Sequence, residues 1–324
     1  MSRIQNLLMI AATAFGLSAL AATAVAAADF PTRPVKVIVQ TGPGSSIDVS
    51  ARLLAEGLSK RWGEQVLVIN QPGSGGFVAA RALASAPADG YTLFFAASSV
   101  FVALPEIRKD IASSVASFIP ISFIGEQPMA VAVPAGSNIK SMADLAEAAK
   151  KASQGLSCAV STRGGLSHLS GESLRAASGM NLVFINYPGT AQALNDVLGG
   201  RVPVLVDSLS ALIGPAAGGQ IRIIGVGSSD RLSIMKNVPT VGETVKGFEA
   251  TAWFALVAPE GTQKAVVDKI ATDVKMVLAD QTIADKMRKT STFIKDVPAD
   301  NLPGFIAAQR AKWSLIVQKF AVSK

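Results

Sequence analysis

The stretch KVIVQTGPGSSIDVSARLLAEGL, residues 36–58, decides the fold. A β-branched apolar run stops at the loop GPG, two serines follow, and apolar residues then recur at helical spacing from Ile47. We therefore expect a strand, a glycine loop and the N-terminus of a helix. The N–H groups at such a helix end lack intrahelical partners and favour an anion.

Ser45 and Asp48 have the spacing of a helix capping box, with Ser45 at the cap and an acid three positions later. Capping is compatible with anion binding if Asp48 points back into its own helix. In that arrangement the loop amides of Gly44 and Ser46 are expected to stay free for the anion.

Strand-length apolar runs alternate with helical patterns along the whole chain, which predicts an α/β fold of parallel sheets covered by helices. The chain length of 324 residues favours two lobes. We expect lobe 1 to comprise residues 29–130 and 256–324 and lobe 2 to comprise residues 131–255. Two chain crossings, near residues 130–134 and 252–258, would form a hinge. The expected strands cover residues 35–39, 66–69, 91–96, 156–160, 182–186, 202–206 and 221–226, and the expected helices cover residues 47–58, 77–86, 141–152, 166–177, 191–198, 263–279 and 303–320.

Residues 1–28 have the pattern of a cleavable secretory signal. Arg3 supplies a positive start, residues 7–20 are apolar and alanine-rich, and AVA at 24–26 fits a cleavage site within Ala26 to Ala28. We therefore expect export to the periplasm. An uncleaved N-terminal membrane anchor is the alternative, although the apolar stretch is shorter than a usual span.

The charge of the chain suits an acidic solute. It is +7 in total, and loss of Arg3 with the signal leaves 29 basic and 23 acidic groups, or +6. The basic residues are scattered, with KMRK at 286–289 as the densest run, and aromatic residues are few. Nucleic-acid binding, which uses a basic stripe with stacking aromatics, is not indicated.

Cys158 is the one cysteine and His168 the one histidine. An intramolecular disulfide or a cysteine metal cluster is therefore excluded, and we expect no metal and no cofactor. We interpret Cys158 as a small core residue.

Three glycine-containing loops lie between the end of an expected strand and the start of an expected helix, at residues 42–46, 161–165 and 187–190. In open parallel sheets such loops gather at the carboxyl edge, where ligands bind. Each helix end contributes about 0.3–1 kcal/mol towards a negative group. Two or three converging ends suit one carboxylate.

Two other kinds of site fit the sequence less well. The first loop lacks the third glycine of a dinucleotide fingerprint, because Ile47 stands there. No Gly-x-Ser-x-Gly elbow occurs, and a serine triad would have to recruit His168 from a helix start. A catalytic role is left without a group for proton transfer.

A series of motifs also carries a family resemblance. In order along the chain these are FPTRPVKVIV, PGSSID, NQPGSGG, APADGYTL, GLSHLSGE, NYPGTAQALNDVLGGRV, VLVDSL, NVPTVGE and TAWFALVAPEGT. Together they resemble the Bug family, the extracytoplasmic solute receptors of tripartite tricarboxylate transporters, over nearly all of the chain after the signal.

The resemblance implies a two-lobed periplasmic binding protein, type II-like, with an open sheet in each lobe and no catalytic activity. Such a receptor closes on a small carboxylate and delivers it to two integral-membrane transporter subunits. A receptor that signals to a sensor kinase would have the same fold, so that alternative stays open. A carboxylate-processing hydrolase is an alternative from another class.

The resemblance also implies which residues bind the ligand, mainly through loop amides, small hydroxyls and bridging waters. The residues that match the family's motif positions are Gly44, Ser45 and Ser46 in lobe 1, Ser161, Thr162, Gly164, Gly165, Ser167, Tyr187, Pro188, Gly189 and Thr190 in lobe 2, and Ser98, Ser99 and Asp207 as neighbours in the cleft.

This chain departs from the family pattern at two loops. The family usually has Pro-Gly-Gly in the first loop, where Ser45 here replaces the second glycine, and Gln40-Thr41 replaces a common aromatic residue. Arg163 stands where small residues are usual, so it could contact a second carboxylate; the alternative is a loop arginine that faces solvent. His168 is usual in the family, and we interpret it as a packing residue.

Overall fold

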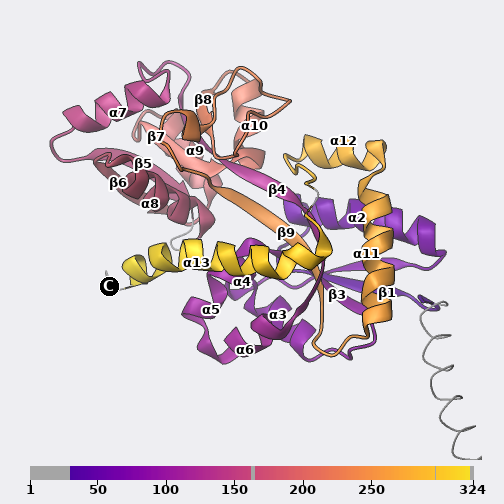
Figure 1. Ribbon diagram of the computed structural model, residues 1–324. Coiled ribbons are helices and arrows are strands. Elements are labelled where there is room, and N and C mark those ends of the chain that lie inside the picture. Colours follow the sequence, from indigo (N-terminus) through magenta and orange to yellow (C-terminus); the bar gives the residue numbers. More distant parts are fainter. Residues whose placement is uncertain (1–29, 162–164, 296, 322–324) are drawn as a thin grey trace, which may run out of the picture.

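The computed structural model describes residues 30–161, 165–295 and 297–321. The expected signal segment therefore lies outside the described residues, as do three expected ligand residues, Thr162, Arg163 and Gly164. Figure 1 shows two lobes joined by two long strands, with one helix lying along both. No described helix is both long enough and apolar enough to cross a membrane.

Lobe 1 contains one half of the sheet, in the strand order β2-β1-β3-β9-β4. Strands β1, β2 and β3 are parallel, as expected, but β9 runs antiparallel to both β3 and β4. The prediction of purely parallel sheets is wrong here, because β9 and β4 carry the chain between the lobes in opposite directions. The strand bounds are β1 Val35–Val39, β2 Val66–Asn70, β3 Thr92–Ala97, β4 Ile119–Pro134 and β9 Thr251–Ala258.

Lobe 2 contains the other half. Strand β4 continues into it and pairs with β7 on one side and β8 on the other, and β5 and β6 extend the sheet beyond β7. The parallel ladder β7-β5-β6 places three strand ends side by side. The bounds are β5 Leu156–Ser161, β6 Leu182–Tyr187, β7 Val204–Ser208 and β8 Ile221–Val226.

Helices cover both faces of each half-sheet. In lobe 1, α2 and α11 bury an apolar face against β1 and β9, with Leu54 and Ile270 fully enclosed. In lobe 2, α7 and α8 cover one face while α9 and α10 cover the other. The bounds are α2 Ser46–Trp62, η1 Ser74–Gly76, α3 Phe77–Ala84, α4 Ser98–Val102, α5 Leu104–Ile107, α6 Lys109–Ser117, α7 Met142–Lys151, α8 Leu166–Ser178, α9 Thr190–Leu198, α10 Leu209–Ala217, η2 Val241–Glu243, α11 Lys264–Leu278, α12 Gln281–Lys289, η3 Ala299–Asn301 and α13 Leu302–Ala321.

The strand exchange between the lobes takes place at Met129. Residues of β4 up to Pro128 pair with β9, and those from Met129 pair with β7 and β8. Gly227 ties this point to the second crossing, because its N–H donates to Met129 O (2.7 Å) and its carbonyl accepts from Ala250 N (2.8 Å). A Cβ at position 227 would lie 2.3 Å from Ala250 O, so only glycine lets the backbones approach this closely.

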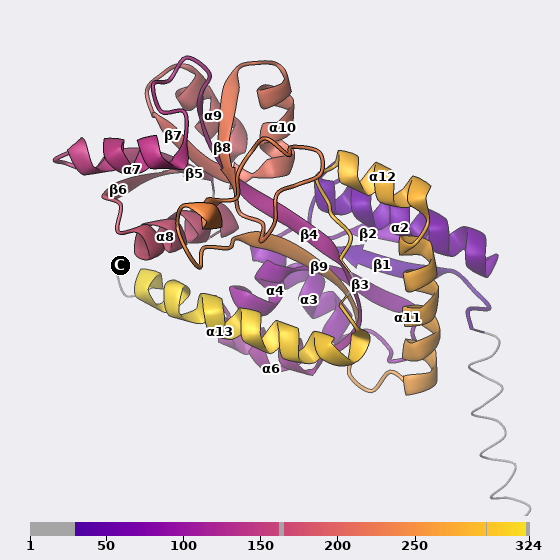
Figure 2. The ribbon, with the colours of Figure 1, turned by 45° about the horizontal axis from the view of Figure 1, so that its top comes forward.

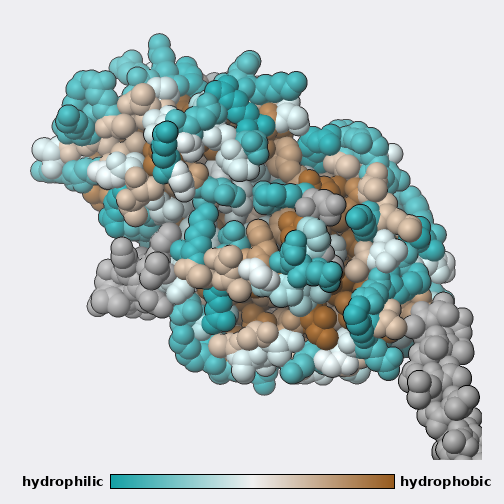
Figure 3. Space-filling view, viewed as in Figure 1, coloured by the Kyte–Doolittle hydropathy of each residue, from teal (hydrophilic) through white to brown (hydrophobic). Residues whose placement is uncertain are grey.

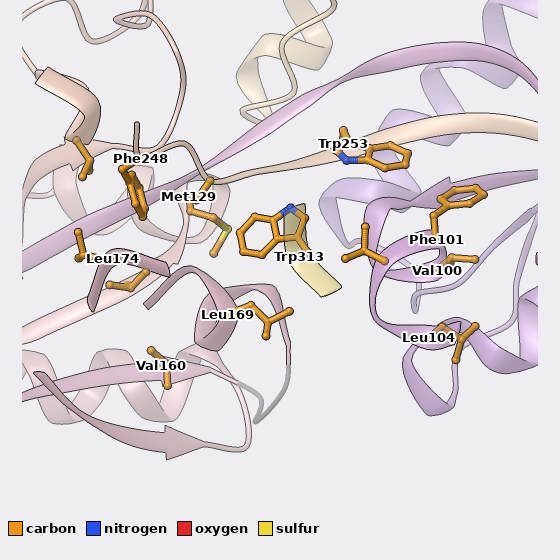
Figure 4. Packing of buried hydrophobic residues seen from close by; sticks show 14 of the residues in the cluster. Val100, Phe101, Leu104, Met129, Val160, Leu169, Leu174, Phe248, Trp253 and Trp313 are labelled. Carbon is orange, nitrogen blue, oxygen red and sulfur yellow. The ribbon is translucent and has the colours of Figure 1, made fainter. Parts of the chain in front are cut away.

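Helix α13 lies along the side of both lobes (Figures 1 and 2) and contacts α4 and β4 as well as α8. Its Trp313 is 2% exposed and belongs to an apolar cluster that includes Val100 from lobe 1 and Leu169 from lobe 2. Figure 4 shows the indole of Trp313 next to Met129 and Leu169, with Val100 and Phe101 farther off on the side of lobe 1. The core of the molecule therefore runs continuously from one lobe to the other.

Candidate functional site

The loop after β1 is built around Gly44. Gly44 has φ +82, in the left-handed region that favours glycine, whereas Ser45 has φ −68 and ψ 158, an ordinary extended conformation. A serine therefore fits without strain where the family usually has glycine. Its hydroxyl caps α2 by accepting the N–H of Asp48 (3.2 Å) and also bonds to the hydroxyl of Thr41 (2.7 Å).

Asp48 does point back into the structure, but it takes an amide that we expected to stay free. Its Oδ2 accepts the N–H of Gly44 (2.9 Å), and the side chains of Arg52 and Asn70 donate to the same carboxylate. Burial acts to raise the pKa of Asp48, but the hydrogen bonds from Arg52, Asn70 and Gly44 outweigh it and the pKa is lowered. The expectation of a free Gly44 amide is wrong, because a buried carboxylate must find donors nearby.

Gln40 connects this loop to the end of β3. Its amide nitrogen donates to Ser99 Oγ (3.0 Å), and its carbonyl oxygen accepts the N–H of Ala97 (3.0 Å). The glutamine that replaces the family's aromatic thus orients Ser99 on α4. Ser98, next to it, is 5% exposed.

Gln127 was missed by the sequence reasoning. It lies on β4 just before the strand exchange, where its Oε1 accepts the hydroxyl of Ser46 (3.2 Å) and its Nε2 donates to Thr290 O (3.1 Å). Two residues further on, Met129 pairs with Ser208 at the end of β7. The first loop of lobe 1 is therefore anchored to the hinge near the strand ends of lobe 2. The signal available in the sequence was a glutamine inside a long, largely apolar run, and the structure shows that this glutamine is buried.

In lobe 2, Ser167 near the start of α8 fixes the end of β5. The Ser161 N–H donates to Ser167 Oγ (2.8 Å), and that hydroxyl donates in turn to Val206 O (2.5 Å) on β7. Ser167 is 4% exposed. Its hydroxyl is thus used to tie β5, α8 and β7 together, and Ser161 stands at the strand end with its side chain beside Asp207.

Asp207 lies near the end of β7, and the hydroxyls of Ser161, Thr190 and Ser208 lie against its carboxyl group. These residues come from the ends of two adjacent strands, β5 and β7, and from the start of α9, the helix that follows β6. Asp207 is 3% exposed; its Oδ1 accepts the Ser208 N–H (2.7 Å), and its Oδ2 has no hydrogen-bond partner among the described residues. Burial raises the pKa of Asp207, while the Ser208 N–H and the nearby hydroxyls act in the opposite direction.

The loop after β6 divides its expected residues between two tasks. The Tyr187 hydroxyl donates to Asp196 Oδ2 (2.7 Å) on α9, and burial with this bond raises the pKa of Tyr187 to about 12. Gly189 caps α9 in an extended conformation, and Thr190 is its first residue. Tyr187 therefore uses its hydroxyl to fix the loop, while Thr190 is placed at Asp207.

The two lobes meet where α4 faces α8. Ser98 and Ser99 share a cavity of 20 Å³ with Leu166, which begins α8, and Trp313 closes it. The hydroxyls of lobe 1 and the helix start of lobe 2 thus line one space. Of the predicted residues, Ser161, Ser167, Thr190 and Asp207 form one group, and Ser98 and Ser99 face its helix α8.

A pocket of 420 Å³ lies elsewhere, between β4, α11 and residues 294, 295, 297 and 298 of lobe 1. Figure 3 shows hydrophobic atoms reaching the surface in the middle of this lobe. The lining of the 420 Å³ pocket is largely apolar, and Lys295 on the pocket's rim is paired with Glu126 (2.9 Å). This pocket is larger than the cavity between the lobes, but it lacks the converging donors that a carboxylate needs.

Residue chemistry gives no sign of catalysis in the part of the chain that the structure describes. Cys158 is fully buried on β5, and desolvation raises the pKa of its thiol to about 12, so it is inert. No group of three or more histidine, cysteine or acidic side chains among the described residues could hold a metal ion. The polar groups at the strand ends are suited to holding an anion.

Comparison with known proteins agrees with this chemistry. The sequence model of the tripartite tricarboxylate transporter family receptor, TctC, matches residues 50–322. The chain belongs to this receptor family. The family consists of solute-binding receptors and not of enzymes, and the fold of the chain is the type II-like fold of periplasmic binding proteins.

Individual TctC relatives cover most of the chain. It is 36% identical over 271 residues to a UPF0065 protein of Bordetella bronchiseptica, spanning 83% of this chain and 80% of that protein. The structure of the periplasmic binding protein BugD is 31% identical, has a TM-score of 0.74 and covers 90% of this chain and 99% of its own. Rpa4515 of R. palustris, solved with adipate, is 28% identical with a TM-score of 0.78 and coverages of 90% and 98%.

Proposed function

We propose that this TctC receptor binds a small carboxylate between its lobes and delivers it to the two integral-membrane subunits of a tripartite transporter. The observation that carries the proposal is the group at the lobe 2 strand ends, where Ser161, Thr190 and Asp207 converge beside the start of α9. Rpa4515 was solved with adipate, and this chain matches 98% of the length of Rpa4515.

The helix ends supply the positive potential. Helices α8 and α9 have 13 and 9 residues and begin at the strand ends of β5 and β6. The first N–H groups of each are without intrahelical partners, and each end contributes about 0.3–1 kcal/mol towards a negative group, more when partly buried. With small hydroxyls between them, these ends can hold a carboxylate without a cationic side chain.

Closure of the lobes would complete the site. The strand exchange at Met129 and the contact between Gly227 and Ala250 lie near the two expected crossings, where the lobes would flex. The lobe bounds expected from the sequence, residues 29–130 and 256–324 for lobe 1 and residues 131–255 for lobe 2, are part of this proposal. Closure strips water from the ligand and brings the hydroxyls of Ser98 and Ser99 towards α8. The apparent affinity therefore depends on the lobe equilibrium as well as on the contacts.

The proposed location is the periplasm, reached through the signal at residues 1–28. N-terminal sequencing of the exported protein tests this directly. A first residue within positions 27–29 supports a cleaved signal, whereas an intact Met1 in the membrane fraction contradicts it.

A thermal-shift screen of the mature, refolded protein tests the ligand class. Refolding removes acid carried through purification, and the panel should contain monocarboxylates, dicarboxylates such as adipate, tricarboxylates, amino acids and aromatic acids. A ligand at about 100 times its Kd adds about 2.7 kcal/mol to the free energy of unfolding. That gain corresponds to several degrees in the melting temperature.

Two variants locate the binding site. Thr190→Val removes a hydroxyl beside Asp207 with little change of volume and should reduce the ligand-induced shift. Lys275→Ala, in the 420 Å³ pocket, should leave the shift unchanged. The reverse result would move the site to that pocket.

A variant at Arg163 tests whether this residue distinguishes dicarboxylates from monocarboxylates. If its guanidinium contacts the far end of a ligand, Arg163→Ala should weaken a dicarboxylate more than its monocarboxylate analogue. Equal losses in a titration of both acids would reject the far-end contact.

A further inference from the structure

One carboxyl oxygen in the lobe 2 group is unaccounted for. Asp207 Oδ2 is buried without a hydrogen-bond partner among the described residues, while Oδ1 accepts the Ser208 N–H at 2.7 Å. A buried, unpaired polar atom costs about 1–3 kcal/mol, and such an orphan in a native fold needs a reason. Asp207 sits in the group of hydroxyls to which the proposed ligand would bind.

The surroundings of Asp207 disfavour its charged form. Burial is the largest influence and raises the pKa of Asp207. The groups that act in the opposite direction are the Ser208 N–H and the hydroxyls of Ser161, Thr190 and Ser208. None of these is a cation. An ionised Asp207 would also repel the anion that the helix ends attract.

The ionisable side chains on the neighbouring elements are engaged elsewhere. His168 Nε2 lies 3.6 Å from Glu172 Oε1, and Arg175 also pairs with Glu172. The elements that pack against β7 are β4, β5, α8, α9 and α10, and α10 carries no ionisable side chain. Glu126 on β4 pairs with Lys295, and Asp196 on α9 pairs with Arg201. The others are Cys158 on β5 and His168, Glu172 and Arg175 on α8.

We propose that Asp207 is protonated in the liganded receptor and donates a hydrogen bond from Oδ2 to the ligand carboxylate. This inference rests on the proposed function. Two carboxyl groups within hydrogen-bond distance cannot both be ionised, so they share one proton, which comes from solvent when the ligand enters. The receptor thus takes up a proton together with its anion, and the orphaned oxygen acquires its partner.

The linkage between proton and ligand gives the inference a measurable form. Because the protonated receptor binds better, the affinity for the acid should fall as pH rises above the pKa of free Asp207, by up to about tenfold per pH unit. An asparagine at this position keeps an N–H donor and has no proton to lose. Asp207→Asn should therefore bind the acid with an affinity that stays flat over the same pH range.

Isothermal titration of the mature protein with adipate, malate, citrate and benzoate provides the test. Titration of each binder in two buffers with different ionisation enthalpies counts the protons taken up by wild type without the need for a variant. We expect uptake approaching one proton at a pH above the pKa of free Asp207, and none with Asp207→Asn. Asp268→Asn, an exposed acid on α11 paired with Lys264, is the matched control and should keep the wild-type profile.

The outcomes separate the two proposals. A panel in which no carboxylate binds overturns the proposed function and this inference together. A carboxylate that binds with a flat pH profile and no proton uptake leaves the proposed function intact and overturns the role of Asp207. Uptake that persists in Asp207→Asn but disappears in His168→Gln assigns the proton to His168 and also overturns it.

Discussion

The two lobes bring comparable polar residues to the cleft but use them differently. In lobe 1 the carboxylate of Asp48 is satisfied by Gly44, Arg52 and Asn70, so the loop after β1 is closed upon itself. In lobe 2 the carboxyl group of Asp207 keeps one oxygen unpaired among the residues described. The difference indicates that the loop of lobe 1 is already fixed by its own hydrogen bonds, while lobe 2 keeps a carboxyl oxygen with which a ligand can still form a hydrogen bond.

Removal of the side chain that both lobes share should have the largest effect. Trp313 is fully enclosed between α4 and α8, and Trp313→Ala should lower the free energy of unfolding by about 3–5 kcal/mol because it leaves a large cavity. Chemical denaturation measures the loss. Trp313→Phe should retain most of the stability, and an equal loss in both variants would show that the indole's bulk is not what joins the lobes.

Removal of the Asp48 carboxylate, whose donors all lie in lobe 1, should cause the second largest loss of stability. Asp48→Ala leaves the Gly44 amide, Asn70 and Arg52 without their acceptor, and we expect a loss of about 2 kcal/mol, discounted for the half-exposed Arg52. The pKa of Asp48 is lowered, so its contribution is present above the unfolded pKa and is lost as pH falls through the folded pKa. Urea denaturation at several pH values measures this.

An exposed acid provides the control for Asp48. Asp268→Ala breaks only the exposed pair with Lys264 and should cost less than about 0.5 kcal/mol. If both variants lose the same stability, the loop of lobe 1 is not held by its carboxylate, and the contrast between the lobes fails on that side.

The free protein should show the opposite pH dependence at Asp207. Its pKa is raised, so below the ordinary value of 3.8 the group is neutral in both states and costs nothing, and the cost of its charge appears as pH rises through the folded pKa. The stability of Asp207→Asn relative to wild type should therefore increase with pH, by about 1.4 kcal/mol for each unit of pKa shift. A difference that is constant from about pH 3 to pH 8 would mean that the pKa is not raised.

Apart from the Asp268 control, the smallest effect should come from Ser45, the loop residue that departs from the family. Ser45→Ala removes the cap of α2 and should cost about 1 kcal/mol, whereas Ser45→Gly, which restores the family's second glycine, should cost only a few tenths. Thermal unfolding of the two variants distinguishes them. A larger loss for glycine would show that backbone freedom, not the cap, governs this loop.

Much of the local structure was predictable because its causes are local. The apolar runs predicted β1 and β8 at their observed bounds, and Ser45 caps α2 through the spacing that the sequence displays. Helices α4, α5, α6, α10 and α12 were missed, since each spans nine residues or fewer and shows too little of a helical period. Of the site, the three strand-end loops were predicted from sequence, whereas Gln127 was not, because its role depends on contacts with residues 46 and 290.

The sequence by itself determined that three glycine loops follow strands and open helices, because strand, turn and cap preferences act over a few residues. Only the tertiary structure decided that β9 runs antiparallel in lobe 1, that α13 packs Trp313 between the lobes, and that Asp48 takes an amide while Asp207 keeps an oxygen unpaired within the described part of the chain. Each of these depends on groups far apart in the chain, whose hydrogen bonds and desolvation are set by packing.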